Sequence, residues 1–170
     1  MPSDVIDQLL DQWAHERPDL DASPMGVVGR VLRLGAFLQR RVEAVLEPHD
    51  LTLWQFDVLA TLRRSGKPFS LSPTQLMREV MLSSGAMTNR LDRLETRGLV
   101  RRRPDPDDRR GVRIELTAAG RRLIDKAIAT RFDEAREVVD NLGQRERQSL
   151  ESTLRKLLLA VTPDTPRRNP

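Results

Sequence analysis

Residues 83–117 read SSGAMTNRLDRLETRGLVRRRPDPDDRRGVRIELT, and the first half of this stretch contains the start and stop signals of a helix. Ser83 is of the type that caps the N-terminus of a helix, and Gly98 can adopt the left-handed conformation that ends one. We therefore expect a helix over residues 84–97. The apolar residues on the core face of this helix are Met87, Leu91 and Leu94.

The second half of the stretch predicts a β-hairpin. Residues 99–103 read as a short strand, and residues 112–116 alternate apolar and polar side chains with the period of a strand. Segment 104–111 between them is rich in residues that form turns. Upstream, Ser72-Pro73 starts another helix, which stops near Met81. Two helices joined by a short turn and followed directly by a hairpin make a winged helix-turn-helix.

The flanking segments predict further helices, because residues 25–47 and 107–162 contain no proline. The candidate core residues of a helix over 25–46 are Val28, Leu32, Phe37, Val42 and Leu46. The fold class is mainly α with a small β-hairpin wing. The expected organisation is an extra N-terminal helix and linker (1–24), a first dimerisation helix (25–51), the winged helix-turn-helix domain (52–117), C-terminal dimerisation helices (118–162) and a disordered tail (163–170).

The terminal helices carry apolar stripes that a small winged-helix core leaves without an obvious partner. Such stripes mark an association surface, so we expect an intertwined homodimer. The alternative is that these helices fold back on their own core.

Basic residues concentrate on the predicted helix and wing. Residues 83–113 hold nine arginines, five acids and no lysine, whereas residues 1–25 hold six acids and one arginine. Many basic stretches are only solvated surface, but this one falls on a helix-turn-helix. Because guanidinium groups suit phosphates and base edges, we expect double-stranded DNA as a partner.

The expected DNA contacts come from two places. The outer face of the second helix would read the major groove, and the loop of the wing would enter the minor groove. Asp107 or Asp108 would brace a wing arginine. The alternative is a solvated hairpin tip with local salt bridges. The candidate DNA-binding residues are Ser83, Ser84, Gly85, Asn89, Arg93, Arg109 and Arg110.

Several classes of protein are excluded by composition. Cysteine is absent, which excludes disulfides and thiolate metal sites, and two scattered histidines argue against any metal site. We see no carboxylate pair, catalytic triad or phosphate-binding loop, so we expect neither an enzyme nor a cofactor. No apolar run approaches the roughly 18 residues of a membrane span, and the N-terminus is acidic, so we expect a cytoplasmic location and no membrane contact.

The wing carries a family resemblance. Its pattern is Asp-x-Arg, five residues, then Leu-Thr, over residues 108–117, preceded by SSGAMTNRLDRLETRGLVRRRPD. Over about residues 28–159 the chain resembles the MarR-type transcriptional regulators. The resemblance implies a dimeric winged-helix protein that binds pseudo-palindromic operators, usually as a repressor released by a small ligand.

The stretches ERPDLDASPMGVVGRVLRL, LTLWQFDVLATLRRSG and LSSGAMTNRLDRLE are similar to the PecS/urate-responsive subgroup of that family. The similarity implies an anionic aromatic or purine ligand such as urate. The alternative is a constitutive DNA-binding dimer with no effector. The implied ligand residues are Trp13, Asp57, Arg90 and Arg102, the last with its register open among Arg101, Arg102 and Arg103.

Independently of the resemblance, a helical wheel places Arg90 on the flank of the buried face of its helix. It would then face a cleft between the DNA-binding lobe and the dimer helices, where guanidinium groups and an indole suit an anionic purine. The alternative is a structural salt bridge between Arg90 and Asp57.

Overall fold

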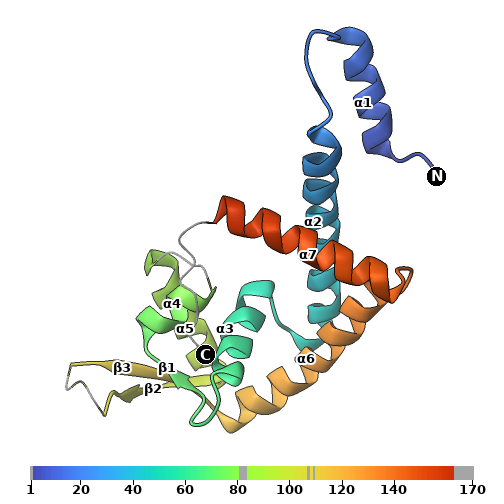
Figure 1. Cartoon of the computed structure of the whole chain (residues 1–170). Coiled ribbons are helices and arrows are strands. Elements are labelled where there is room, and N and C mark those ends of the chain that lie inside the picture. Colours follow the sequence, from blue (N-terminus) through green and yellow to red (C-terminus); the bar gives the residue numbers. More distant parts are fainter. Residues whose placement is uncertain (1, 81–83, 107, 109, 163–170) are drawn as a thin grey trace. The chain divides into compact units, whose positions relative to one another are not determined.

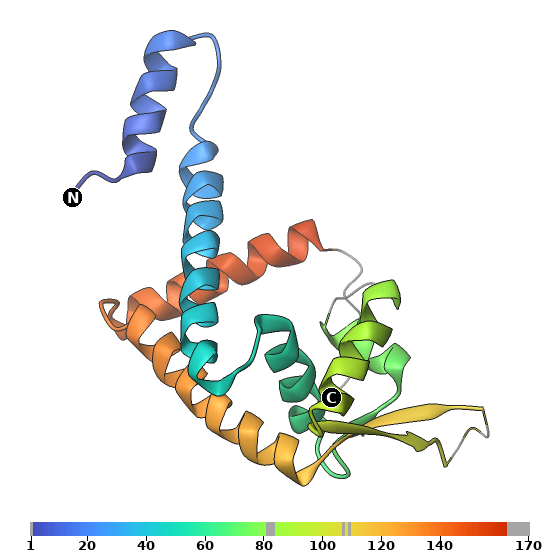
Figure 2. The same ribbon diagram turned by 180° about the vertical axis from the view of Figure 1, so that it is seen from behind.

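The computed structural model describes residues 2–80, 84–106, 108 and 110–162. They fall into two compact units that divide after Arg131, and each unit is described by itself. The first unit contains a winged helix-turn-helix, with a small antiparallel sheet beside the helices (Figures 1 and 2). The expected fold class is thus confirmed.

The first unit contains all the strands and most of the helices (Figure 1). In chain order they are α1 (Val5–Glu16), α2 (Met25–Leu46), the 3-10 helix η1 (Glu47–His49), α3 (Leu53–Arg64), β1 (Ser70–Leu71), α4 (Pro73–Val80), α5 (Ser84–Thr96), β2 (Val100–Pro104), β3 (Val112–Leu116) and most of α6 (Ala118–Val138). The second unit contains the end of α6 and α7 (Gln144–Val161). No helix among the described residues has the length and apolar character needed to cross a membrane.

Short polar side chains fix the starts of two helices, and the start of α4 is the one predicted from Ser72-Pro73. The Ser72 hydroxyl accepts a hydrogen bond from the Gln75 N–H (3.2 Å) at the start of α4. The Thr117 hydroxyl accepts one from the Gly120 N–H (3.0 Å) at the start of α6. At the end of α5, Gly98 has a φ of +68°, the left-handed conformation that glycine adopts without strain. Ser83, the expected cap of α5, lies outside the described residues.

The sheet has three strands in the order β1-β3-β2, whereas the sequence predicts only the hairpin β2–β3. In the hairpin, Val100 pairs with Leu116 and Pro104 with Val112. The additional strand β1 is two residues long and pairs with β3. Arg113 of β3 strengthens this pairing, since its Nε donates to the Ser70 hydroxyl (2.9 Å).

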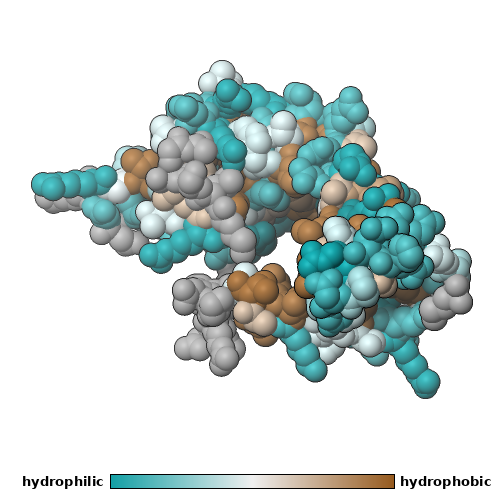
Figure 3. All heavy atoms as spheres, turned by 90° about the horizontal axis from the view of Figure 1, so that it is seen from above, coloured by the Kyte–Doolittle hydropathy of each residue, from teal (hydrophilic) through white to brown (hydrophobic). Residues whose placement is uncertain are grey.

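The core lies between α3, α4, α5, the hairpin and the start of α6. Its largest fully buried side chains include Leu46, Leu59, Leu62, Leu76, Leu94, Ile114 and Ile124. From α2, only Val42 and Leu46 are buried, and the expected core positions Val28, Leu32 and Phe37 are 44%, 67% and 49% exposed. That part of the prediction is wrong for the single chain, because only the C-terminal end of α2 reaches the core cluster. Apolar residues on the viewed surface are brown in Figure 3.

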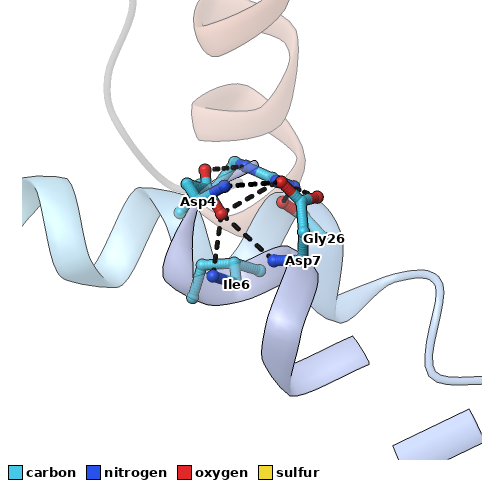
Figure 4. Close-up of polar contacts among 5 residues, drawn as sticks. Asp4, Ile6, Asp7 and Gly26 are labelled. Carbon is cyan, nitrogen blue, oxygen red and sulfur yellow. Dashed lines mark hydrogen bonds and ion pairs between the residues drawn. The ribbon is translucent and has the colours of Figure 1, made fainter. Parts of the chain in front are cut away.

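Polar contacts at Asp4 and Asp7 join the start of α1 to α2 (Figure 4). Arg30 of α2 donates from Nε to Asp4 Oδ2 (2.8 Å) and from Nη2 to Asp7 Oδ1 (2.5 Å). Asp4 also caps α1, accepting from the Ile6 N–H at 2.7 Å. The hydrogen bond from Arg30 holds the pKa of Asp4 below its usual value. Ile6 is buried against Gly29, where a Cβ would lie 3.1 Å from Ile6 Cδ1.

Candidate functional site

Helix α5 separates a buried face from an exposed one. Met87, Leu91 and Leu94 are 2%, 3% and 0% exposed, which confirms the core face predicted from their spacing. The side chains of Asn89 and Arg93 are exposed. Helix α5 begins at Ser84, but the side chains of Ser84 and Gly85 lie outside the description. The described part of this helix therefore presents an amide and a guanidinium to solvent.

The wing loop between β2 and β3 is held by hydrogen bonds within the loop, two between backbone groups and one to the Asp108 side chain. Asp108 Oδ1 accepts the Arg110 N–H at 2.9 Å, and the Asp108 carbonyl accepts the Gly111 N–H at 2.8 Å. The Asp105 N–H donates to the Gly111 carbonyl at 2.9 Å. Asp108 thus braces the backbone of the loop, and the side chain of Arg110 is exposed. Asp107 and Arg109 lie outside the described residues.

Arg101 and Arg103 on β2 point away from α5. Arg101 Nη2 lies 2.5 Å from Glu115 Oε1, and Arg103 Nε lies 3.8 Å from Glu115 Oε2. Both pairs are internal to the hairpin, because Glu115 is a residue of β3.

Arg102, between them, ties β2 to α5. Its backbone N–H donates to Glu95 Oε1 (2.8 Å), and its Nη2 lies 2.6 Å from Asp92 Oδ1. A second guanidinium nitrogen, Nη1, contacts Glu95 Oε2. Burial acts to lower the pKa of Arg102, but the hydrogen bonds to Asp92 and Glu95 outweigh it and raise the pKa. The wing and α5 are therefore joined by two carboxylates on one guanidinium.

A cavity of about 780 Å³ lies between the C-terminal part of α2, α3 and α5. Trp54 and Asp57 of α3 and Arg90 of α5 line it. The guanidinium carbon of Arg90 lies 5.4 Å from the centroid of the Trp54 ring, within the range of a cation–π contact. Arg90 Nη1 is shielded from solvent and has no hydrogen-bond partner among the residues that the structure describes. No ion pair joins Arg90 to Asp57 within the same residues, so the salt bridge considered from the sequence is not present.

Several carboxyl groups line the same cavity as Arg90. Burial raises the pKa of Asp57, and the charges of Arg64 and Arg131 only partly oppose the rise. Glu43, Glu47 and Asp50 also line the cavity. Asp50 forms an ion pair with Arg97 at 2.8 Å. The cavity therefore combines one arginine, one indole and several hydrogen-bond acceptors.

The structure brings together two of the four ligand residues implied by the resemblance, Asp57 and Arg90. Arg102 lines a different, smaller cavity of about 350 Å³. Trp13 lies on α1, is 51% exposed and does not line the cavity that holds Arg90.

Trp54 is a cavity residue that the sequence reasoning missed. It precedes Asp57 by three residues on α3, and side chains three apart share a helix face. The three-residue spacing from Asp57 could have indicated that Trp54 lines the same cavity.

Comparisons with known proteins bear on the fold and the family of this chain. A family model described as the MarR family matches residues 49–111. The regulator PecS of Dickeya dadantii (strain 3937) is 37% identical over 149 residues, which cover 88% of this chain and 90% of that protein. The multiple antibiotic resistance protein MarR of Escherichia coli (strain K12) is 34% identical over 120 residues, 70% of this chain and 81% of that protein.

Solved structures of similar fold include complexes with DNA. A cysteine-to-serine mutant of E. coli MarR complexed with operator DNA aligns with a TM-score of 0.69 at 29% identity, covering 92% of this chain and 99% of that chain. A MarR family regulator of Streptomyces coelicolor in complex with DNA aligns with a TM-score of 0.76 at 23% identity, covering 85% of this chain and 91% of that chain, and shows the shared fold. The winged helix-turn-helix, the two curated relatives and the family match lead to one conclusion: this chain belongs to the MarR family of DNA-binding transcriptional regulators and is not an enzyme.

Proposed function

We propose that this regulator is a repressor, acts in the cytoplasm, binds a pseudo-palindromic operator as a homodimer, and is released by a small anionic aromatic or purine ligand such as urate. The observation that carries the ligand proposal is Arg90, a guanidinium on α5 that lines a cavity and makes no ion pair with Asp57 within the described residues. No cofactor is required.

Operator binding uses the surface formed by α5 and the wing. Asn89 and Arg93 face solvent on α5 and suit the edges of adenine and guanine in the major groove. Arg109 and Arg110 of the wing loop enter the minor groove. Ser84 and Gly85 at the start of α5, with Ser83 before them in the sequence, are proposed to contact the phosphate backbone. Two copies of this surface address half-sites about one helical turn, roughly 34 Å, apart.

Exposed apolar faces among the described residues support the homodimer. On α2, Val27, Val28, Val31, Leu32, Leu34 and Phe37 are each at least 40% exposed. On α7, Leu154, Leu158, Leu159 and Val161 are likewise exposed. Exposed apolar stripes of this length mark an association surface, and a second copy of the chain supplies an identical stripe.

The carboxyl groups of the cavity sharpen the ligand class. A simple aromatic carboxylate would satisfy Arg90 but would bring only acceptors to Asp57, Glu43 and Glu47. A purine anion carries both an anionic edge for the guanidinium and ring N–H donors for these acceptors. The proposed preference is therefore for urate and xanthine over benzoate.

Release follows from the position of Arg90 on the DNA-reading helix. A ligand that binds the guanidinium favours the conformation of α5 that suits the ligand rather than the operator. A tenfold loss of operator affinity requires only about 1.4 kcal/mol of differential binding, which one rearranged charge contact supplies.

The experiment uses a labelled duplex from the intergenic DNA beside the gene, chosen for an inverted repeat. We expect dimer binding in an anisotropy titration, weakened by urate or xanthine and much less by benzoate. Operator binding that none of these ligands changes would favour the constitutive dimer, and a monomer with no operator affinity at low salt would overturn the proposal.

The wing is tested through salt. Arg109→Ala combined with Arg110→Ala should weaken operator binding and flatten its dependence on salt, because neutralised phosphates set that slope. An unchanged slope would remove the wing from the DNA interface.

A further inference from the structure

The chain has two tryptophans, Trp13 on α1 and Trp54 on α3. Trp54 packs one part of its surface against the hydrophobic core and lines the cavity with another. Its ring is also the group that contacts the Arg90 guanidinium, at 5.4 Å from ring centroid to guanidinium carbon. An indole fixed by the core beside a cation is a rigid apolar wall next to a positive charge.

We propose that Trp54 is the aromatic contact surface of the ligand cavity, so that a planar anion lies against the indole while its charge meets Arg90. This inference rests on the proposed function and adds a residue to it. Indole faces pack well against flat ring systems, and guanidinium groups bind anions with charge-assisted hydrogen bonds. A ligand that has both a flat ring and a negative charge uses both neighbours at once.

The size and the lining of the cavity agree with a flat bicyclic ligand. Its volume of about 780 Å³ lies within the usual range for small-molecule sites. Asp57, one helical turn after Trp54, borders the same space. An aliphatic anion would meet Arg90 but would leave the indole wall uncovered, so Trp54 selects for aromatic ligands.

The contact between Trp54 and Arg90 also allows a bound ligand to affect α5. Without ligand, the Trp54 ring holds the Arg90 guanidinium, and α3 and α5 are linked through that contact. A planar anion inserted at this wall becomes a new partner of both groups. The ligand therefore acts on the α3–α5 contact directly.

The test uses the full chain in two single-tryptophan forms, Trp13→Phe and Trp54→Phe, with urate and xanthine as probes and absorbance-corrected fluorescence. Trp13→Phe leaves Trp54 as the emitter and should show saturable quenching and reduced access of acrylamide when urate binds. Trp54→Phe should lose the quenching. Calorimetry gives the affinities independently of fluorescence.

Trp54→Leu, which removes the ring, should weaken urate binding about tenfold, while Trp54→Phe recovers part of the loss. Operator affinity without ligand should stay within about threefold of the parent, which separates a role in the cavity from a role in folding. Acetate serves as the aliphatic control and should bind equally poorly to all forms.

The outcomes are distinguishable. If calorimetry shows urate binding but the quenching belongs to Trp13, or if Trp54→Leu binds urate as the parent does, the assignment of Trp54 is overturned and the proposed function stands. If Trp54→Leu does not fold, the acrylamide measurement on Trp13→Phe still tests the assignment. Urate that binds without shielding Trp54 from acrylamide would overturn it. If neither urate nor xanthine binds the parent, the assignment and the proposed ligand both fall.

Discussion

Two regions of the DNA-binding unit connect α5 to a neighbouring element through an arginine, and they do so in opposite ways. At the junction of α5 and β2, Arg102 contacts two carboxylates, Asp92 and Glu95. In the cavity between α2, α3 and α5, Arg90 contacts the Trp54 ring and has a buried nitrogen with no hydrogen-bond partner among the described residues. The charge of Arg102 is neutralised by its two carboxylate partners. The charge of Arg90 is left available for a ligand.

The difference separates a structural joint from a responsive one. Displacing Arg102 costs several charge-assisted hydrogen bonds and leaves two acids unpaired, so the wing follows α5. Displacing Arg90 costs one cation–π contact and gains whatever a ligand anion offers. The four predictions below test this contrast, in order of decreasing effect.

The largest effect is expected from Gly120→Ala, which challenges the rigidity of the junction. A Cβ at Gly120 would lie 2.0 Å from the carbonyl oxygen of Leu99, directly before β2, so the backbone of the junction must move. We expect a loss of about 3 kcal/mol of folding stability, measured by urea unfolding. Gly26→Ala is the control, since its Cβ would meet Leu10 and Arg30 at ordinary distances of 3.5 and 3.6 Å. Equal stability of the two variants would contradict the close packing.

Next comes Arg90→Ala, which removes the available charge. Because a charge-assisted hydrogen bond to the ligand is lost, urate affinity by calorimetry should fall at least about tenfold, with operator affinity changed less than about threefold. Arg93→Ala, three residues along α5 and exposed, should show the reverse pattern. Parallel loss of both activities in Arg90→Ala would make Arg90 a structural residue.

A smaller effect is expected from Arg102→Ala at the junction. The side chain is 33% exposed, so its two ion pairs are partly screened and contribute about 1 kcal/mol. Operator affinity should fall about fivefold, because the wing is no longer fixed to α5, while urate affinity is retained. Arg101→Ala is the matched control. It should change operator affinity less than Arg102→Ala, because the pair of Arg101 with Glu115 lies within the hairpin and does not join the wing to α5. Loss of urate binding in Arg102→Ala would return Arg102 to the ligand site.

The smallest effect is expected from Asp57→Asn, and it is measured as the dependence of folding stability on pH. The folded pKa of Asp57 lies above its ordinary value of 3.8, so its ionisation destabilises the fold at neutral pH, and the penalty fades as pH falls through the folded pKa towards 3.8. The variant should therefore be slightly more stable than the parent at pH 7 and lose this advantage in acid. Asp4→Asn should do the opposite, because Asp4 has a lowered pKa and its contribution is present above pH 3.8. Thermal melts between about pH 2 and pH 7 in about half-unit steps compare the two, and parallel slopes would contradict the assignment.

Local signals made much of the fold predictable. The bounds expected for α2, 25–46, match the structure because prolines flank the segment on both sides. The caps at Ser72 and Thr117 and the left-handed Gly98 act within a few residues. Strand β1 was not predictable in this way, since a two-residue strand exists only through its distant partner β3.

Periodicity gave the apolar face of α2 but not what covers it. Val28, Leu32 and Phe37 have helical spacing whether their partner is the chain's own core or another molecule. The site shows the same limit. Arg90 was placed beside the buried face by its spacing on α5, whereas the contact with Trp54 depends on how α3 packs against α5.

The carboxylate of Asp4 has one further consequence. It caps the first turn of α1 and at the same time accepts hydrogen bonds from Arg30 of α2. A twelve-residue helix is marginal by itself in water. Formation of the helix α1 and its attachment to α2 are therefore a single cooperative event. An N-terminal segment that detaches from α2 loses its helical structure as well.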